Sequence, residues 1–343
     1  MIYSSSNVWS LYKFNDSLYY LKHQLIFYLI GIFLMIITSK LDYSIYKKYA
    51  NIIIFGALFL LIMVLIPGIG QIRNGSRSWF GIGSLGIQPS ELSKLALIIF
   101  TAKYLSNNEK DIKKFKRGIL PILLIIFIFF GLIMLEPDFG TSMVIAVTLV
   151  SMLFISNIKL SFFGIMGLIG LLGIVGLIII APYRISRIIS FINPWSDPLG
   201  SGFQIIQSLY AIGPGGLFGL GFGNSIQKHF YLPEPQTDFI FAIISEEFGI
   251  VGVTILSILF LTLFIKVIKI SLNSNDLFAK YLSFGLIMGI IIQTVLNISV
   301  VIGLVPVTGV TLPFISYGGS SLLVSMISMG IILNISKKTY TVL

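Results

Sequence analysis

Long apolar runs separated by short polar segments follow one another along most of the chain. Nine of them approach or exceed the ~20 residues that a helix needs to cross a bilayer. The runs cover 22–39, 50–69, 91–105, 118–135, 139–157, 160–181, 239–265, 280–302 and 311–336. Inside lipid a spanning segment must satisfy its own backbone polar groups, which a helix does. We therefore predict an all-α fold, a polytopic membrane helix bundle with nine spans in this chain.

Composition agrees with this pattern and excludes a water-soluble enzyme. Hydrophobic residues make up 56% of the chain and charged residues 10%, against about 25% charged in a typical soluble domain. The chain has no cysteine, so disulfides, thiolate metal sites and a cysteine nucleophile are excluded. Its two histidines, His23 and His229, are too far apart in sequence to suggest a metal site.

Basic residues predict the orientation. They gather at 40–49, at 106–117, around 266–280 and after the last run, and strict alternation puts all of these on one side. The positive-inside rule makes that side cytoplasmic, with the C-terminus inside. The net charge of +10 then reflects cytoplasmic loops, and no nucleic-acid partner is expected. The segments left outside are 70–90, 136–138, 182–238 and 303–310.

Two features of the outer segments favour a functional site there. The segment 182–238 is far longer than an ordinary connection, and long loops are usually functional. Four of the five arginines are also outside, against the topology rule: Arg73, Arg77, Arg184 and Arg187. The planar guanidinium suits bidentate contact with phosphate. The alternative is that these arginines only anchor the protein to lipid headgroups.

The most concentrated group of carboxylates lies at 231–247, where the long outer segment enters a span. Thr237 is a candidate N-cap, which would place Asp238 in the first helical turn. An acid at membrane depth is a functional candidate. The alternative for Asp238 is a carboxylate that only favours the helix dipole, and for Glu246 and Glu247 it is pairing with a lysine of a neighbouring helix. One helical face would carry Asp238, Ala242, Ser245, Glu246 and Gly249.

Three other outer stretches carry weaker signals. Glu91 and Lys94 open a helix and stand three residues apart, so they can neutralise each other, unless they are a dipole-favoured glutamate and a snorkelling lysine. The glycine-rich stretch 213–223 lacks the Gly-Lys-Ser/Thr of a nucleotide-binding loop and favours a re-entrant turn or close backbone approach to a ligand. Small residues at 316–321 favour close helix packing.

These residues predict an outward-facing site with arginines and carboxylates, which two classes of protein could use. One is an enzyme acting on a phosphate-bearing lipid. The other is a transporter or flippase with buried charges on its pathway. A transporter usually has paired broken helices in two related halves. The sequence shows no such symmetry, which favours the enzyme.

Five groups of residues resemble motifs of the SEDS family (shape, elongation, division and sporulation proteins), which includes FtsW, RodA and SpoVE. They run in the family's order over nearly the whole chain. The motifs Pro-Glu-Pro-Gln-Thr-Asp at 233–238 and Pro-Val-Thr-Gly at 306–309 resemble the FtsW/SpoVE branch more than RodA. The matching stretches are 75–79 with 88–91, 136–141, 191–195, 232–242 with 246–247, and 309–321.

The resemblance implies a single membrane domain over 1–343 with 182–238 as its large extracytoplasmic loop. The family has ten spans, and residues 1–6 are similar to the end of its first span. We therefore expect the first span to be truncated here, and about 15–20 further apolar residues to be encoded upstream in frame, since that completes a span.

The resemblance also implies an activity. Such proteins are peptidoglycan glycosyltransferases of the bacterial cytoplasmic membrane, and they polymerise lipid II at its outer face during cell division or sporulation. Their expected partners are a class B penicillin-binding transpeptidase and the surrounding membrane lipids. The donor carries its own leaving group, a lipid diphosphate, so no nucleotide site is needed. The alternative activity is lipid II flipping.

The same resemblance implies site residues. Asp238 matches the family's catalytic acid and would act as the general base. Arg77, Glu91, Lys94 and Arg187 lie in stretches similar to the family's and would bind substrate. We also assign substrate binding to Arg184 and Glu234 in the long outer segment. The sequence shows no cofactor or metal motif, and a divalent cation is an expectation from the resemblance alone.

Overall fold

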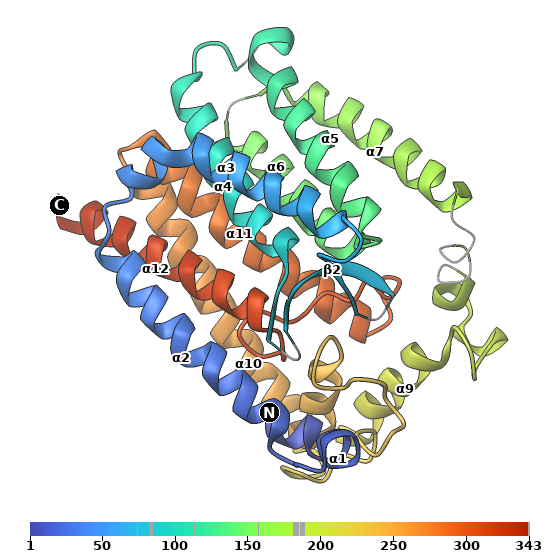
Figure 1. The fold of residues 1–343 in the computed structure, drawn as a ribbon. Coiled ribbons are helices and arrows are strands. Elements are labelled where there is room, and N and C mark those ends of the chain that lie inside the picture. The colour runs from blue at the N-terminus through green and yellow to red at the C-terminus, as the bar shows by residue number, and fades with distance from the viewer. Residues whose placement is uncertain are drawn as a thin grey trace. The chain divides into compact units, whose positions relative to one another are not determined.

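The computed structural model describes residues 1–341 apart from 74, 83, 84, 113, 157, 181–184 and 186–188, and it is mostly helical (Figure 1). The chain divides into two compact units. The first contains Met1–Lys22, Lys159–Leu259 and Thr294–Tyr317, and the second His23–Ile158, Phe260–Gln293 and Gly318–Leu343. The single membrane domain over 1–343, with its large loop at 182–238, stays a prediction.

Each of the nine predicted apolar runs overlaps a long helix. The long helices are α2 (Tyr19–Lys40), α3 (Ser44–Leu65), α4 (Pro89–Asn107), α5 (Leu120–Leu135), α6 (Phe139–Phe154), α7 (Leu160–Ile180), α10 (Ile240–Asn273), α11 (Leu277–Val301) and α12 (Gly319–Thr341). Two shorter helices are α1 (Ile2–Phe14) and α9 (Phe203–Ile212).

Among the described residues, six helical stretches are long and apolar enough to cross a membrane. They lie in α2, α3, α10, α11, α12 and in α5 together with the turn before it. The chain is therefore a multi-pass membrane protein, as predicted, while the exact number of nine spans stays a prediction. Among the remaining three, α6 has only 16 residues, and α4 carries the charges of Glu91, Lys94 and Lys103.

Packing in the second unit places α4 in the interior. It contacts α3, α5, α6 and α12 (Figure 1), and it buries Leu97, Ala102 and Leu105 almost completely. The candidate spanning stretch of α12 is 72% buried, whereas that of α2 is 22% buried. Buried polar side chains of α4 and α12, such as Lys94 and Ser325, therefore face protein. The apolar outer side chains of α2 are suited to lipid.

A small antiparallel sheet in the segment 70–90 corrects the all-α prediction. Strands β1 (Gln71–Arg73), β2 (Ser76–Ile82) and β3 (Leu85–Ile87) pair in the order β1-β2-β3. The segment connects α3 and α4, and β2 contacts both helices. The lipid argument that requires helices applies only within the hydrocarbon region. Outside it, neighbouring strands satisfy their backbone groups as well as a helix does.

The helix α10 is broken at Gly249, where φ is 61° and ψ is −159°. The glycine-rich stretch fills the break with backbone hydrogen bonds. Leu220 N–H donates to the Glu246 carbonyl at 2.9 Å, and Ile250 N–H donates to the Gly216 carbonyl at 2.9 Å. A Cβ at Gly249 would lie 2.5 Å from the Gly219 nitrogen. The close backbone approach found here is to protein of the same unit, whereas the prediction named a ligand or a re-entrant turn.

Candidate functional site

Asp238 lies in the turn 235–239, two residues before α10 begins at Ile240. This corrects the prediction of a first-turn position capped by Thr237. The Thr237 hydroxyl contacts the Glu234 carbonyl oxygen at 2.8 Å and a carboxylate oxygen of Asp238 at 2.5 Å. A capping hydroxyl would instead accept from a backbone N–H of the first turn. Asp238 itself is half-buried.

Three consecutive main-chain carbonyls, those of residues 236–238, accept hydrogen bonds that fix the main chain around Asp238. Tyr317 N–H donates to the Gln236 carbonyl at 2.8 Å, the Ser316 hydroxyl donates to the Thr237 carbonyl, and the Asn297 amide donates to the Asp238 carbonyl at 2.7 Å. All belong to the first unit. Sequence reasoning missed Asn297 and assigned Ser316 to packing. The available signal was a polar side chain within an apolar run, which is uncommon unless it has a partner.

Glu234 lies in the same turn region as Asp238 and has an unusual backbone. Its φ is +44°, in the left-handed region that few residues other than glycine adopt. Such conformations persist only where the surrounding structure holds them, and they cluster at functional sites. Its side chain is half-buried. Its role in substrate binding stays a prediction, and so does that of Asp238 as the catalytic base.

Glu91 and Lys94 form a buried ion pair in the second unit. Their charged atoms are 2.7 Å apart, and the residues are only 6% and 5% exposed. Lys94 also donates to the Gln293 side-chain oxygen at 2.7 Å, and the Gln293 amide donates to Ser321 at 2.9 Å. The predicted mutual neutralisation is confirmed. A snorkelling lysine would keep its ammonium in water, so that alternative is wrong.

Glu136 and Asp138 occupy the connection between α5 and α6. Asp138 accepts from Thr141 N–H at 3.0 Å, as the N-cap of α6, and from the Gln88 amide at 2.8 Å. Neither carboxylate oxygen of Glu136 has a hydrogen-bond partner within the described part of the chain. Burial, followed by the charge of Asp138, raises the pKa of Glu136 to about 8. Glu136 therefore carries a proton at neutral pH.

This protonation gives a stability prediction. The folded-state pKa of about 8 exceeds the ordinary value of 4.5, so the stabilisation is full below pH 4.5 and is lost as the pH rises toward 8. In the Glu136→Gln variant the side chain at position 136 has no ionisable group. We expect the Tm of the wild type, relative to Glu136→Gln, to fall between pH 5 and about 8. Thermal unfolding in detergent measures this, with exposed Glu109→Gln as control. Parallel pH profiles would contradict the prediction.

Arg77 lies on β2, in the same unit as Glu91 and Lys94. Its guanidinium makes one long hydrogen bond, 3.5 Å, to the Leu65 carbonyl at the end of α3. Its Nε is buried and has no partner among the residues described. Its role in substrate binding stays a prediction. The other two predicted arginines, Arg184 and Arg187, lie outside the described residues.

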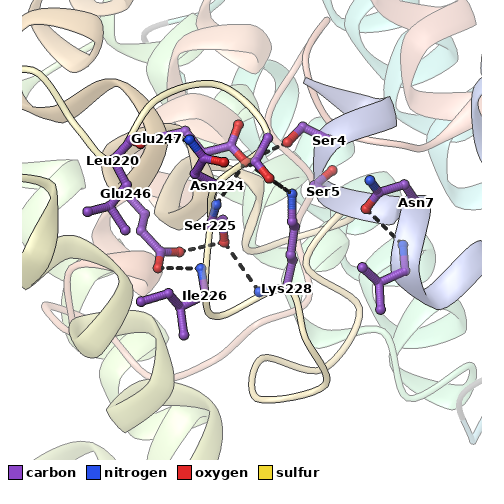
Figure 2. Close-up of polar contacts among 12 residues, drawn as sticks. Ser4, Ser5, Asn7, Leu220, Asn224, Ser225, Ile226, Lys228, Glu246 and Glu247 are labelled. Atoms are coloured by element: carbon purple, nitrogen blue, oxygen red, sulfur yellow. Dashed lines mark hydrogen bonds and ion pairs between the residues drawn. The ribbon is translucent and has the colours of Figure 1, made fainter.

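Glu246 and Glu247 are fully buried near the break in α10 and hold the loop before Asp238 (Figure 2). Glu246 accepts from the Ser225 hydroxyl at 2.5 Å and from Ile226 N–H at 2.8 Å. Glu247 accepts from the Ser4 hydroxyl, and its Oε1 is 3.6 Å from the Lys228 ammonium. Lysine pairing is confirmed for Glu247, although the lysine comes from a loop. For Glu246 it is wrong, because backbone N–H groups and a serine take that place.

The buried charges of Lys228 and Glu247 lead to a second stability prediction. Lys228 is 2% exposed and Glu247 is 0% exposed. Removing one member leaves the other charge unpaired in the interior, which costs about 3–5 kcal/mol. We expect Lys228→Met to lower stability by that amount, and Lys228→Met/Glu247→Gln to recover most of it. Denaturation in detergent checks this. Equal stability of the single and double variants would contradict it.

A divalent cation needs grouped oxygen ligands. Among the residues described, no three or more histidine, cysteine, aspartate or glutamate side chains are placed to hold a metal ion. The side chains of these residues therefore do not form a preformed cation site. The expected cation stays a prediction, and none of the chemistry below depends on it.

Comparison with known proteins tests the resemblance. The family profile of the FtsW, RodA and SpoVE cell cycle proteins matches residues 1–341. Stage V sporulation protein E of Bacillus subtilis is 53% identical, and the match covers 98% of this chain and 92% of that protein. The probable peptidoglycan glycosyltransferase FtsW of Coxiella burnetii is 40% identical over 99% of this chain and 92% of that protein.

Solved structures agree with this result. A chain of a peptidoglycan synthase complex, studied for its coordination of polymerization and crosslinking, has a TM-score of 0.79 and 28% identity. The match covers 98% of this chain and 95% of that chain. RodA of Thermus thermophilus has a TM-score of 0.70 and 26% identity, covering 98% and 94%. The chain therefore belongs to the SEDS family, the FtsW, RodA and SpoVE proteins.

Proposed function

We propose that this protein is a peptidoglycan glycosyltransferase that polymerises lipid II during cell division or sporulation. The observation that carries the proposal is full-length similarity to proteins of that name. The match with the Coxiella burnetii FtsW covers 92% of that protein at 40% identity. The sporulation relative, at 53% identity, supports the FtsW/SpoVE branch. The half-buried Asp238, held on its main chain by three hydrogen bonds, is suited to the chemistry.

In the proposed reaction Asp238 acts as the general base. Its carboxylate takes the proton of the acceptor sugar hydroxyl, and that oxygen attacks the anomeric carbon of the donor. The bond from this carbon to the lipid diphosphate breaks, and the diphosphate leaves with the bonding electrons. A positioned general base contributes about 10²–10⁴-fold to such a reaction. The Thr237 hydroxyl, which shares its one proton between this carboxylate and the Glu234 carbonyl, orients the carboxylate.

Cationic side chains would stabilise the charge that develops on the diphosphate. Arg77 is half-buried on β2, which leaves part of its side chain exposed. Arg184 and Arg187 are proposed from the sequence alone. Glu91 neutralises Lys94 at 2.7 Å, so this pair would offer donors to the substrate with little net charge. Glu234 would bind a sugar or peptide group beside Asp238.

We further propose nine membrane spans, with the C-terminus in the cytoplasm and Asp238 at the outer face of a bacterial cytoplasmic membrane. The distribution of lysine and arginine supports this orientation. A class B penicillin-binding transpeptidase is the proposed partner. Similarity to a chain of a peptidoglycan synthase complex supports it, because that complex combines polymerization with crosslinking.

A lipid II flippase is the second candidate, and the broken helix α10 is the observation that favours it. Discontinuous helices occur at the binding sites of many transporters, usually in pairs from two related halves. The break at Gly249 fits the first part of that description. Its backbone groups, however, bond to the stretch 216–221 of the same unit, which leaves them unavailable to a substrate.

Purified protein, its transpeptidase partner and lipid II in detergent separate the two candidates. Detergent micelles have no second leaflet, so flipping cannot be observed there. Glycan polymer under these conditions supports the glycosyltransferase. Absence of polymer, together with movement of fluorescent lipid II across liposomes containing the protein, would support the flippase and overturn the proposal.

A further inference from the structure

We propose that Asn297 is a positioning residue that fixes the main chain at Asp238 and thereby aims the catalytic carboxylate; this rests on the proposed function. Asn297 lies on α11 within the first unit and is 1% exposed. Its amide nitrogen donates to the Asp238 carbonyl and to the Val310 carbonyl, each at 2.7 Å. Both amide hydrogens are thus used.

The donor to the Asp238 carbonyl comes from α11 and not from the usual helical partner. In a regular helix the carbonyl of residue 238 would accept from the N–H of Ala242. Here Ala242 N–H donates to the Phe239 carbonyl at 2.9 Å, three residues back. Asn297 donates to the Asp238 carbonyl from a segment 59 residues away in sequence, so this hydrogen bond ties the turn to α11.

The second hydrogen bond of Asn297 connects this turn to the segment after α11. Val310 belongs to the stretch 310–317. In the same stretch, the Ser316 hydroxyl donates to the Thr237 carbonyl and Tyr317 N–H donates to the Gln236 carbonyl. One amide therefore joins the two main-chain segments that meet at the catalytic residue. The carboxylate of Asp238 is two bonds from the Cα, so a rotation of this turn would move it directly.

The side chain at position 297 must donate hydrogen bonds. Both partners of the nitrogen are carbonyls, which only accept, and the side-chain oxygen of Asn297 has no partner in the described part of the chain. Aspartate has the same shape, but its carboxylate donates no hydrogen bond and would face two carbonyl oxygens. When protonated it donates one. Glutamine retains both donors but displaces them by one methylene.

The test is steady-state polymerisation of lipid II by the purified full chain with its transpeptidase partner. A displacement of about 1 Å in a catalytic group can cost 10²-fold in rate. We expect Asn297→Asp to lower kcat by about 10–100-fold, with KM changed by less than about threefold, because substrate binding is left intact. Asn297→Gln, with its donors displaced, should give an intermediate kcat.

A pH profile separates positioning from a loss of folded protein. The ratio of variant to wild-type kcat is used, because Asp238 and Glu234 titrate in both proteins. We expect the ratio for Asn297→Asp to rise as the pH falls, since the protonated acid regains a donor. Asn297→Leu has no donor, so its ratio should stay low and flat. Asn297→Gln replaces the aspartate variant if the latter does not fold.

Asn334→Asp is the matched control. Asn334 is a buried asparagine of α12, 7% exposed, that donates to the Ser39 carbonyl at 3.2 Å in the second unit. It should lose stability without a selective loss of kcat. A wild-type kcat for Asn297→Asp, or a loss that follows only the folded fraction and is flat with pH, would overturn the proposal. Full activity of Asp238→Asn would instead overturn the proposed base and leave the effect of Asn297 to be measured separately.

Discussion

Asp238→Asn is expected to reduce lipid II polymerisation by about 10²–10⁴-fold while leaving the fold intact. The change is nearly isosteric. It keeps an oxygen that can accept the Thr237 hydroxyl, now 2.5 Å from the carboxylate. The backbone bonds to the Asp238 carbonyl and its neighbours do not involve the side chain. What is lost is a group basic enough to take the acceptor proton. Polymer yield at matched expression, with partner binding checked, measures the effect.

Glu234→Gln is the control for this prediction, because Glu234 is the nearest other acid in the sequence. It lies four residues earlier, between two prolines, and its φ is +44°. As a substrate-binding residue, it should affect KM more than kcat when changed. Wild-type polymerisation by Asp238→Asn, or an inactive Glu234→Gln beside an active Asp238→Asn, would show that the base is assigned to the wrong residue.

The helices could be predicted from sequence because lipid leaves the backbone few alternatives. The sheet at Gln71–Ile87 could not, because that constraint ends outside the hydrocarbon region. There the three strands are short, and the alternation of Ser76, Arg77, Ser78 and Trp79 is too brief to distinguish a strand from a loop.

Predictions at the site succeeded where partners are close in sequence. Glu91 and Lys94 are three residues apart on one helix, so their ion pair follows from helix geometry. The partners of Glu246 come from about twenty residues away, and the Asn297 amide reaches the Asp238 carbonyl across 59 residues. No local rule gives such contacts. A polar residue within an apolar run signals that it has a partner without indicating which one.

The same limit explains the misplaced start of α10. Thr237 followed by Asp238 has the composition of a helix N-terminus, and local preference predicts a cap there. In the structure, contacts from α11 and from the stretch 310–317 take the carbonyls of 236–238, and the helix begins only at Ile240. Long-range hydrogen bonds thus override the local signal at Asp238, the proposed base.

The buried pair of Glu91 and Lys94 gives the second large prediction, which separates a structural role from a catalytic one. Lys94→Met would leave the Glu91 carboxylate, 6% exposed, without its countercharge. Breaking such a pair costs about 3–5 kcal/mol. We expect a corresponding loss of stability and no polymerisation. Denaturation in detergent and polymer yield are measured on the same preparation.

The double variant Glu91→Gln/Lys94→Met removes both charges and should recover most of the stability, since uncharged side chains of similar volume replace buried ion pairs with little cost. If the pair contacts substrate, the folded double variant should stay at least about 10²-fold below wild type, the loss typical of one missing electrostatic contact in a transition state. Lys103→Met is the matched control on the same helix. Among the described residues, its ammonium donates to the Asn51 side-chain oxygen at 3.1 Å, in an exposed position. Stability and activity should both be retained in this variant. A stable double variant with wild-type polymerisation would assign the pair to the fold alone and remove Glu91 and Lys94 from the substrate-binding residues.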